Sequence, residues 1–235
     1  MTYDCSCIST GYGVLDKFIG GFKGSQLVVI ASSPSAVKSA LSASLAQNMA
    51  FGESQVPIGL FPLEAGGLSL MKCIISSKAI IRYSPVISLH ALCRGIREMV
   101  ENDGVRVVFI DGVGLIRKTK RGMPGSQWYA EVFKQLKILT GELGITIVCS
   151  CHLDRTDPAD RRPVVEDIEN YDKIIGFSDI ILLIDNPAMR LGIKEDDTGM
   201  SDIRKVIVAK NSNGSTGGFL MRLNSETGRF EEVGA

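Results

Sequence analysis

The chain has 235 residues, 45% of them hydrophobic, which suffices for the core of one large domain and excludes a mainly disordered protein. Its 26 basic and 26 acidic residues balance, which excludes a generally basic coat for nucleic acid but leaves room for a local basic patch. The sequence has neither an apolar run as long as a membrane span nor a charged-then-apolar signal pattern, so we expect a cytoplasmic protein without a membrane partner.

Apolar, β-branched runs bounded by turn residues predict the strands. In chain order they are residues 26–31 (QLVVIA), 58–63 (IGLFPL), 105–110 (VRVVFI), 145–150 (ITIVCS), 180–184 (IILLI) and 204–209 (RKVIVA). Segments with helical spacing occur at 39–51, 68–80, 89–102 and 129–143. Because strands and helices alternate and the strands are apolar throughout, we expect an α/β fold with a mostly parallel, twisted sheet flanked by helices.

The C-terminal part follows a different pattern. Residues 205–210 and 218–223, joined by the Gly-rich NSNGSTGG, predict a β-hairpin, and SETGRF predicts a turn into a last short strand. No repeat or low-complexity tract interrupts the sequence. We therefore expect residues 1–235 to form a single domain.

The six cysteines form two Cys-x-Cys pairs and two single positions, with only two histidines to join them. This spacing is poor for a zinc site. Cys149 and Cys151 alternate along a predicted strand, which favours buried positions on one face of the sheet over a metal site or a disulfide.

Residues 31–40 (ASSPSAVKSA) lie between a predicted strand and a predicted helix, where a phosphate-binding Walker A loop belongs. The loop pattern is G-x-x-x-x-G-K-[ST]; Lys38 and Ser39 fit it, but Ser32 and Val37 take the places of the glycines. A β-branched residue at positive φ is strained, so we expect Val37 to reshape the loop or to weaken its hold on phosphate. The candidate nucleotide contacts in this loop are Ser35, Val37, Lys38 and Ser39.

Polar residues also follow three other predicted strands. Glu64 follows the second strand, and Asp111 closes the apolar VRVVFID, the Walker B arrangement in which a carboxylate holds the water shell of magnesium. An unpaired buried carboxylate is costly, which argues against a purely structural role for Asp111. His152 follows the fourth strand, either as a sensor of the terminal phosphate or as a partly exposed loop histidine.

A series of segments, taken in order, covers nearly the whole chain: STGYGVLDKFIGGFKGSQLVVIASSPSAVKSALSASLAQNMA, FPLEAG, VVFIDGVGLI, CSCHLDR with RRPVVEDI, FSDIILLID and VAKNSNGSTGGFLMRLNSETGRFEE. This chain resembles the C-terminal, RecA-like motor domain of DnaB-type replicative DNA helicases. The most specific part is the ending, AKN-x-NG-x-TG with N-x-ET-x-RF. The resemblance implies a RecA-like P-loop NTPase that assembles as a hexameric ring of identical subunits around single-stranded DNA, with ATP and Mg²⁺ bound between neighbours.

The resemblance also implies roles for single residues. Lys38 and Ser39 would meet the phosphates and magnesium, with Asp111 completing the metal site. Glu64 would activate the attacking water, and His152 would report the γ-phosphate. Lys210 matches the lysine of the family's K-x-R pair, which reaches the nucleotide of the next subunit. At the places where the family contacts the DNA backbone, this chain carries basic residues, whose alternative interpretation is as ordinary solvated charges. They are Arg117, Lys118, Lys120, Arg121, Arg155, Arg161 and Arg162.

The departures from the family pattern point to weakened hydrolysis. Ser212 stands at the arginine of the K-x-R pair, and loss of such an arginine finger costs on the order of a thousandfold in rate. Arg204, Arg222 and Arg229 are further arginines in this region, and the sequence assigns none of them to that role. We also expect that no N-terminal helical, primase-contacting domain precedes Met1.

We therefore expect a helicase motor domain that binds ATP weakly and hydrolyses it slowly. Two alternatives remain at this stage. The first is an ATPase-silent subunit that binds DNA or joins a helicase assembly, and the second is a structural relic that binds neither nucleotide nor DNA.

Overall fold

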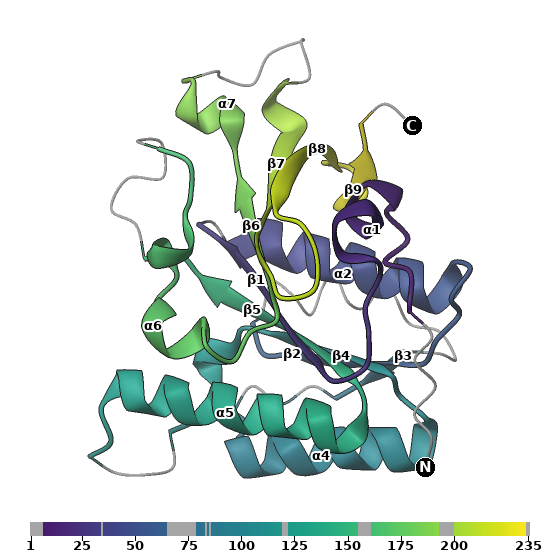
Figure 1. Cartoon of the computed structure of the whole chain (residues 1–235), viewed down its shortest axis with the longest axis vertical. Coiled ribbons are helices and arrows are strands. Elements are labelled where there is room, and N and C mark those ends of the chain that lie inside the picture. Colours follow the sequence, from purple (N-terminus) through teal and green to yellow (C-terminus); the bar gives the residue numbers. More distant parts are fainter. Residues whose placement is uncertain are drawn as a thin grey trace.

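A computed structural model describes residues 7–33, 35–64, 79–82, 84, 86–118, 122–154, 161–192 and 200–233. Within these residues, no helix combines the length and the apolar character that a membrane span requires. The C-terminal strands and α7 lie at the top of the view in Figure 1, and α4 and α5 lie at the bottom.

Helices and strands alternate through most of the chain (Figure 1). The helices are α1 (Gly13–Ile19), α2 (Ser35–Phe51), α4 (Leu89–Asp103), α5 (Gly125–Leu143), α6 (Tyr171–Ile174) and α7 (Pro187–Arg190), with 3₁₀ turns η1 (Val113–Leu115), η2 (Val165–Asp167) and η3 (Met200–Asp202). The strands are β1 (Gln26–Ser32), β2 (Ile58–Pro62), β3 (Ala79–Ile81), β4 (Val107–Asp111), β5 (Thr146–His152), β6 (Ile180–Asp185), β7 (Ile203–Asn211), β8 (Gly217–Asn224) and β9 (Arg229–Glu232).

The described strands form one sheet in the order β3-β2-β4-β5-β1-β6-β7-β8-β9. The pairs from β3 to β6 are parallel, and β7, β8 and β9 are added antiparallel as a meander. The central strands β1, β2 and β4 are buried along their whole length. Strands buried on both faces explain the continuous apolar runs, so the α/β prediction and the C-terminal hairpin are confirmed.

Helices cover both faces of this sheet. Leu41, Leu45 and Met49 of α2 pack with α1 against one face, and Leu92 of α4 and Phe133 of α5 pack against the other. Figure 1 shows α4 and α5 side by side beneath the sheet, with α2 on its opposite side. This three-layer arrangement leaves the ends of the strands as the places where a site can form.

The structure corrects some boundaries. Residues 79 and 80, the last two of the helix predicted over 68–80, belong to strand β3, and the rest of that prediction lies outside the described residues. Helix α5 begins at Gly125 and α2 begins at Ser35, each four residues earlier than expected. Helix α1 was not predicted; it ends at Gly20, whose φ of 70° suits a glycine cap.

Candidate functional site

The carboxyl ends of parallel strands place most of the expected site residues at one edge of the sheet. β1 ends at Ser32, in register with His152 at the end of β5 and with Ile184 of β6. β4 ends at Asp111, in register with the end of β2, and Glu64 follows two residues after β2. Because these strands are neighbours, side chains distant in sequence converge at this edge.

Lys38, Glu64 and His152 meet there through one carboxylate. Lys38 Nζ donates to Glu64 Oε2 at 3.0 Å, and the Lys38 side chain is fully buried. His152 Nε2 lies 3.0 Å from Glu64 Oε1, and the histidine side chain is 47% exposed. The contact with His152 does not have the geometry of a hydrogen bond. The buried Oε1 therefore accepts no hydrogen bond from the described residues. One oxygen of Glu64 is therefore in contact with Lys38 and the other with His152.

Asp111 is held on both oxygens by hydroxyl groups. Ser39 Oγ donates to Oδ2 and Ser150 Oγ donates to Oδ1, each at 2.7 Å. Burial raises the pKa of Asp111 above its usual value, while the hydrogen bonds from Ser150 and Ser39 act in the opposite direction and nearby Glu64 adds to the rise. The carboxylate is thus neither unpaired nor free to rotate.

The first turn of α2 contains the part of the loop that carries Val37. The described non-glycine residues with positive φ are Ser25, Gln55 and Asn170, so Val37 carries no strain of that kind. A reshaped loop, the first of the two expected consequences, agrees with this, and a weakened hold on phosphate stays a prediction. Val37 is partly buried and packs against the core beneath α2. Ser35 is the first helical residue, and Ser32 belongs to β1. Helix N-termini present backbone N–H groups that favour phosphate, so the segment retains that property without its glycines.

The residues present fit a nucleotide with magnesium. The Ser39 hydroxyl and the Asp111 carboxylate, in direct contact, supply the hard oxygen groups that Mg²⁺ prefers. Lys38 supplies the only described ammonium that is in contact with Glu64. When bound, the metal would neutralise phosphate charge, while Lys38 and the start of α2 would face the phosphates.

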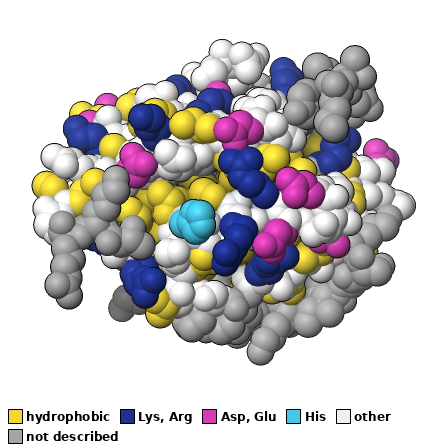
Figure 2. Space-filling view, turned by 90° about the horizontal axis from the view of Figure 1, so that it is seen from below, with side chains coloured by type: hydrophobic (Ala, Val, Ile, Leu, Met, Phe, Trp, Pro, Cys, Tyr) yellow, Lys and Arg dark blue, Asp and Glu magenta, His cyan; other side chains and the backbone are white. Residues whose placement is uncertain are grey.

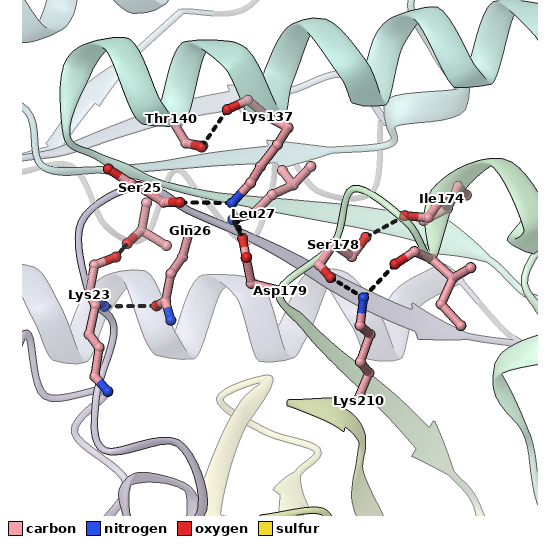
Figure 3. A network of polar contacts seen from close by, with 12 residues as sticks. Lys23, Ser25, Gln26, Leu27, Lys137, Thr140, Ile174, Ser178, Asp179 and Lys210 are labelled. Carbon is pink, nitrogen blue, oxygen red and sulfur yellow. Dashed lines mark hydrogen bonds and ion pairs between the residues drawn. The ribbon is translucent and has the colours of Figure 1, made fainter. Parts of the chain in front are cut away.

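Lys210 lies at the opposite edge of the sheet. It pairs with Ile181 at the start of β6, and its Nζ donates to the carbonyls of Ile175 and Ser178 at 2.5 and 2.6 Å (Figure 3). Ser212, two residues on, donates its backbone N–H to the Asp179 carbonyl at 2.9 Å. Both positions of the expected trans-acting pair therefore lie away from the Lys38 cluster of the same chain.

Arg204 is engaged locally. Its guanidinium donates to the carbonyls of Ser201 and Ile203 at 2.5 and 2.9 Å, and burial lowers its pKa. Its Nε is buried without a hydrogen-bond partner among the described residues. The Arg229 guanidinium donates to Asn48 Oδ1 at 3.0 Å, at the far end of α2. Neither contact places these arginines at the Lys38 cluster.

The basic residues expected to meet DNA divide into three groups. Arg117, Lys118 and Arg162 are exposed on the segments that follow β4 and β5, at the same edge as Lys38. Arg161 instead makes a two-pronged contact with Asp167, at 2.8 and 2.5 Å. Lys120, Arg121 and Arg155 lie outside the described residues.

The opposite, helical face does not present a uniform charge. Figure 2, a view from below onto the side of α4 and α5, shows basic and acidic side chains mixed with apolar ones. Arg97 pairs with Glu142 at 2.5 Å across the two helices, and Arg82 pairs with Glu98 at 2.6 Å. The described part of this face therefore lacks the uniformly basic character that favours binding to phosphates.

The burial predicted for Cys149 and Cys151 on one face of the sheet is confirmed. Cys149 and Cys151 are buried free thiols in the core on the α4–α5 side of the sheet. Burial raises the pKa of Cys151 to about 12; the Lys38 charge opposes this rise, and Glu169 and Glu64 add to it. Within the described residues, no group of three or more His, Cys, Asp and Glu side chains could hold a metal ion.

Sequence reasoning missed two residues at this edge. Ser150 contacts Asp111, and Asp167 accepts hydrogen bonds from Arg161 and from the Val164 N–H at 2.9 Å. A hydroxyl inside an otherwise apolar strand was a usable signal for Ser150. Asp167 gave none, because an acidic residue in a polar loop is usually solvated.

Comparison with known proteins agrees with this geometry. A family model described as DnaB-like helicase C terminal domain matches residues 7–86 and 71–232. A probable plasmid replicative DNA helicase of Chlamydia psittaci is 27% identical, with 95% of this chain and 55% of that protein covered. The replicative DNA helicase DnaB of Haemophilus influenzae is 24% identical, with 96% and 55% covered. This chain spans about half the length of these relatives.

A solved structure described as an ATPase domain has the same fold, with a TM-score of 0.83, 21% identity, and coverage of 99% of this chain and 93% of that one. The RecA-like fold expected from the sequence is thereby confirmed. With the family model matching most of its length, the chain belongs to the DnaB-like helicase C-terminal domain family.

Proposed function

We propose that this chain is the ATP-binding motor domain of a replicative-type DNA helicase. The observation that carries the proposal is the convergence of Lys38, Ser39, Glu64, Asp111 and His152 at one edge of the sheet. In this assignment Lys38 and the first turn of α2 bind phosphate, and Ser39 and Asp111 hold the hydrated Mg²⁺. Glu64 orients the attacking water, and His152 contacts the terminal phosphate across Glu64.

The same proposal requires a neighbouring subunit. Lys210 and Ser212 occupy the edge opposite the nucleotide site, so they can approach a nucleotide only in another copy of the chain. A head-to-tail contact that repeats by rotation closes a ring, which is the hexamer expected for the family. Arg117, Lys118 and Arg162 would face single-stranded DNA, and binding to phosphates suits a motor that moves independently of sequence.

Turnover is expected to be slow in this copy. Ser212 offers no positive charge to a transferring phosphate, and the Lys210 ammonium is held by two carbonyls of its own chain. Because Val37 is unstrained, we assign the slow turnover to the Ser212 edge rather than to the phosphate loop. The same contacts favour the alternative function, an ATPase-silent subunit that binds DNA or joins a helicase assembly.

The test is phosphate release by purified protein with Mg²⁺, ATP and single-stranded DNA, against a Lys38→Ala variant. DNA-stimulated release that Lys38→Ala abolishes supports the motor. Nucleotide binding without release above that variant supports the silent subunit. The proposed cytoplasmic location goes with either function.

A further inference from the structure

Ser150 lies near the end of β5, between two core cysteines, yet it points to the other face of the sheet. Cys149 and Cys151 pack on the α4–α5 side, whereas Val148 belongs to the core beneath α2. Alternation along a strand places Ser150 on the same side as Val148, toward α2. The residue is 1% exposed, so its hydroxyl must find partners inside the protein.

Those partners are two atoms at the end of β4. Ser150 Oγ donates to Asp111 Oδ1 at 2.7 Å and accepts from the Gly112 N–H at 2.7 Å. The other carboxylate oxygen accepts from Ser39 Oγ. Asp111 is thus held from α2 on one side and from β5 on the other, and each oxygen keeps a further lone pair for a metal-bound water.

The contact with Gly112 extends this effect to Glu64. Gly112 has a φ of 94°, and a Cβ built on it would lie 2.6 Å from Glu64 Cγ. The backbone N–H of Glu64 in turn donates to the Asp111 carbonyl at 3.2 Å. The turn after Asp111 therefore forms the surface on which Glu64 packs, and Ser150 anchors that turn.

We propose that Ser150 is a positioning residue, whose hydroxyl fixes the Asp111 carboxylate and the Gly112 turn so that Asp111 and Ser39 present their oxygens together to the Mg²⁺ of a bound nucleotide. This inference rests on the proposed function. Groups that orient a metal-binding side chain commonly change metal affinity by about tenfold to a hundredfold when they are removed. Ser150 touches neither metal nor nucleotide, so its effect is on the magnesium dependence of binding.

The experiment measures binding of a fluorescent, non-hydrolysable ATP analogue to the purified chain as Mg²⁺ is titrated. In Ser150→Ala the half-saturating Mg²⁺ concentration is expected to rise about tenfold, with little change in binding without Mg²⁺. Ser150→Thr keeps a hydroxyl in a strand and is expected to restore the wild-type Mg²⁺ dependence.

Ser44→Ala is the matched control. Ser44 is also 1% exposed, donates to the Ala40 carbonyl at 2.8 Å and accepts from the Phe230 N–H at 3.0 Å. Like Ser150→Ala, Ser44→Ala loses one donated and one accepted buried hydrogen bond, but neither involves Asp111, so its Mg²⁺ dependence is expected to match wild type. Circular dichroism of each variant reports whether the fold is retained.

The outcomes separate this inference from the function on which it rests. If wild type binds the analogue and Ser150→Ala shows the same Mg²⁺ dependence, or Ser44→Ala shows an equal shift, the positioning role is overturned and the function stands. If wild type binds no nucleotide, both are overturned. Should Ser150→Ala fail to fold, Ser150→Cys replaces it; its weak S–H donor is expected to raise the Mg²⁺ requirement, and an unchanged requirement overturns the inference.

Discussion

The two edges of the sheet carry similar charged residues in opposite situations. At the edge with the strand carboxyl ends, Lys38 and Asp111 contact other side chains, and Glu64 keeps a buried oxygen without a hydrogen bond among the described residues. At the opposite edge, Lys137 Nζ donates to Asp179 at 2.6 Å and to the Ser25 carbonyl at 2.9 Å (Figure 3). The Asp179 carboxylate also accepts the Leu27 N–H at 2.7 Å.

This difference separates charges that hold the fold from charges that are available to a ligand. The Leu27 N–H of β1 contacts the Asp179 carboxylate, and the Ser25 carbonyl just before β1 contacts the Lys137 ammonium, so this edge stabilises the sheet. At the Lys38 edge, charged side chains from several elements converge on one another and burial raises the pKa of Asp111, which is typical of a binding site. Four substitutions test this division. The first adds, at the edge where charges hold the fold, a charge that would bind a ligand.

Ser212→Arg is expected to have the largest effect. Ser212 is exposed in the turn after β7 and uses only its backbone N–H to contact Asp179. An arginine there would supply the missing finger to a neighbouring subunit, and such fingers raise turnover by about a thousandfold or more. The measurement is DNA-stimulated phosphate release at saturating ATP. Ser215→Arg, which adds the same charge in the same turn, is the control; an equal rise there would show that added charge alone is responsible.

Lys38→Met is expected to weaken binding of an ATP analogue by about tenfold to a hundredfold, because a hydrogen bond to a charged group contributes roughly 1.5–3 kcal/mol. Lys137→Met removes an ion pair at the other edge, where Asp179 is 2.6 Å away, and is expected to leave nucleotide affinity within about twofold. Equilibrium titration with the fluorescent analogue compares the two variants. Equal losses would mean that the edges are not functionally distinct.

Much of this division could be predicted from sequence. Apolar strands followed by Lys38, Glu64, Asp111 and His152 are a local signal, and parallel pairing brings strand ends together whatever the loops contain. The antiparallel hairpin was equally visible, because Gly and Asn mark its turn.

The rest depended on contacts that span the chain. The strain expected at Val37 is absent because Val37 lies in the first turn of α2, which starts at Ser35. No sequence pattern distinguishes this early helix start from a loop that ends at Ser39. Arg161 was grouped with the solvated basic residues, but it contacts Asp167. That pairing depends on the path of the segment after β5, where Ile168 pairs with Leu153. Lys210 likewise meets the carbonyls of Ile175 and Ser178 only through the register of β6 and β7.

Asp179→Asn is expected to lower the free energy of unfolding by about 2 kcal/mol, because it weakens charge-assisted bonds from Lys137 and from the Leu27 N–H. Nucleotide affinity should not change. Urea unfolding measures the loss. Asp172→Asn is the control, since its pair with Lys173 is exposed and such pairs contribute little. A loss at Asp172 as large as at Asp179 would contradict the structural role of this edge.

Asp111→Asn is expected to raise the free energy of unfolding, by less than Asp179→Asn lowers it. It is also expected to abolish Mg²⁺-dependent nucleotide binding. The physical reason is burial, which raises the pKa of Asp111 and makes its ionised form costly in the folded protein. The Ser39 hydroxyl, which donates to Asp111 at 2.7 Å, can rotate to accept from an amide instead. Urea unfolding without Mg²⁺ or nucleotide measures the gain; a loss of stability would mean that the site edge is structural too.

The pH dependence of that gain fixes its cause. Because the pKa of Asp111 is higher in the folded than in the unfolded chain, the folded state binds more protons between the two values, and wild-type stability falls as pH rises through that interval. Asp111→Asn lacks this titration. The stability gain should therefore be absent below the unfolded pKa of aspartate, near 3.9, and complete above the raised pKa. A gain that does not vary with pH would assign the effect to packing rather than to a charge kept at a cost for binding.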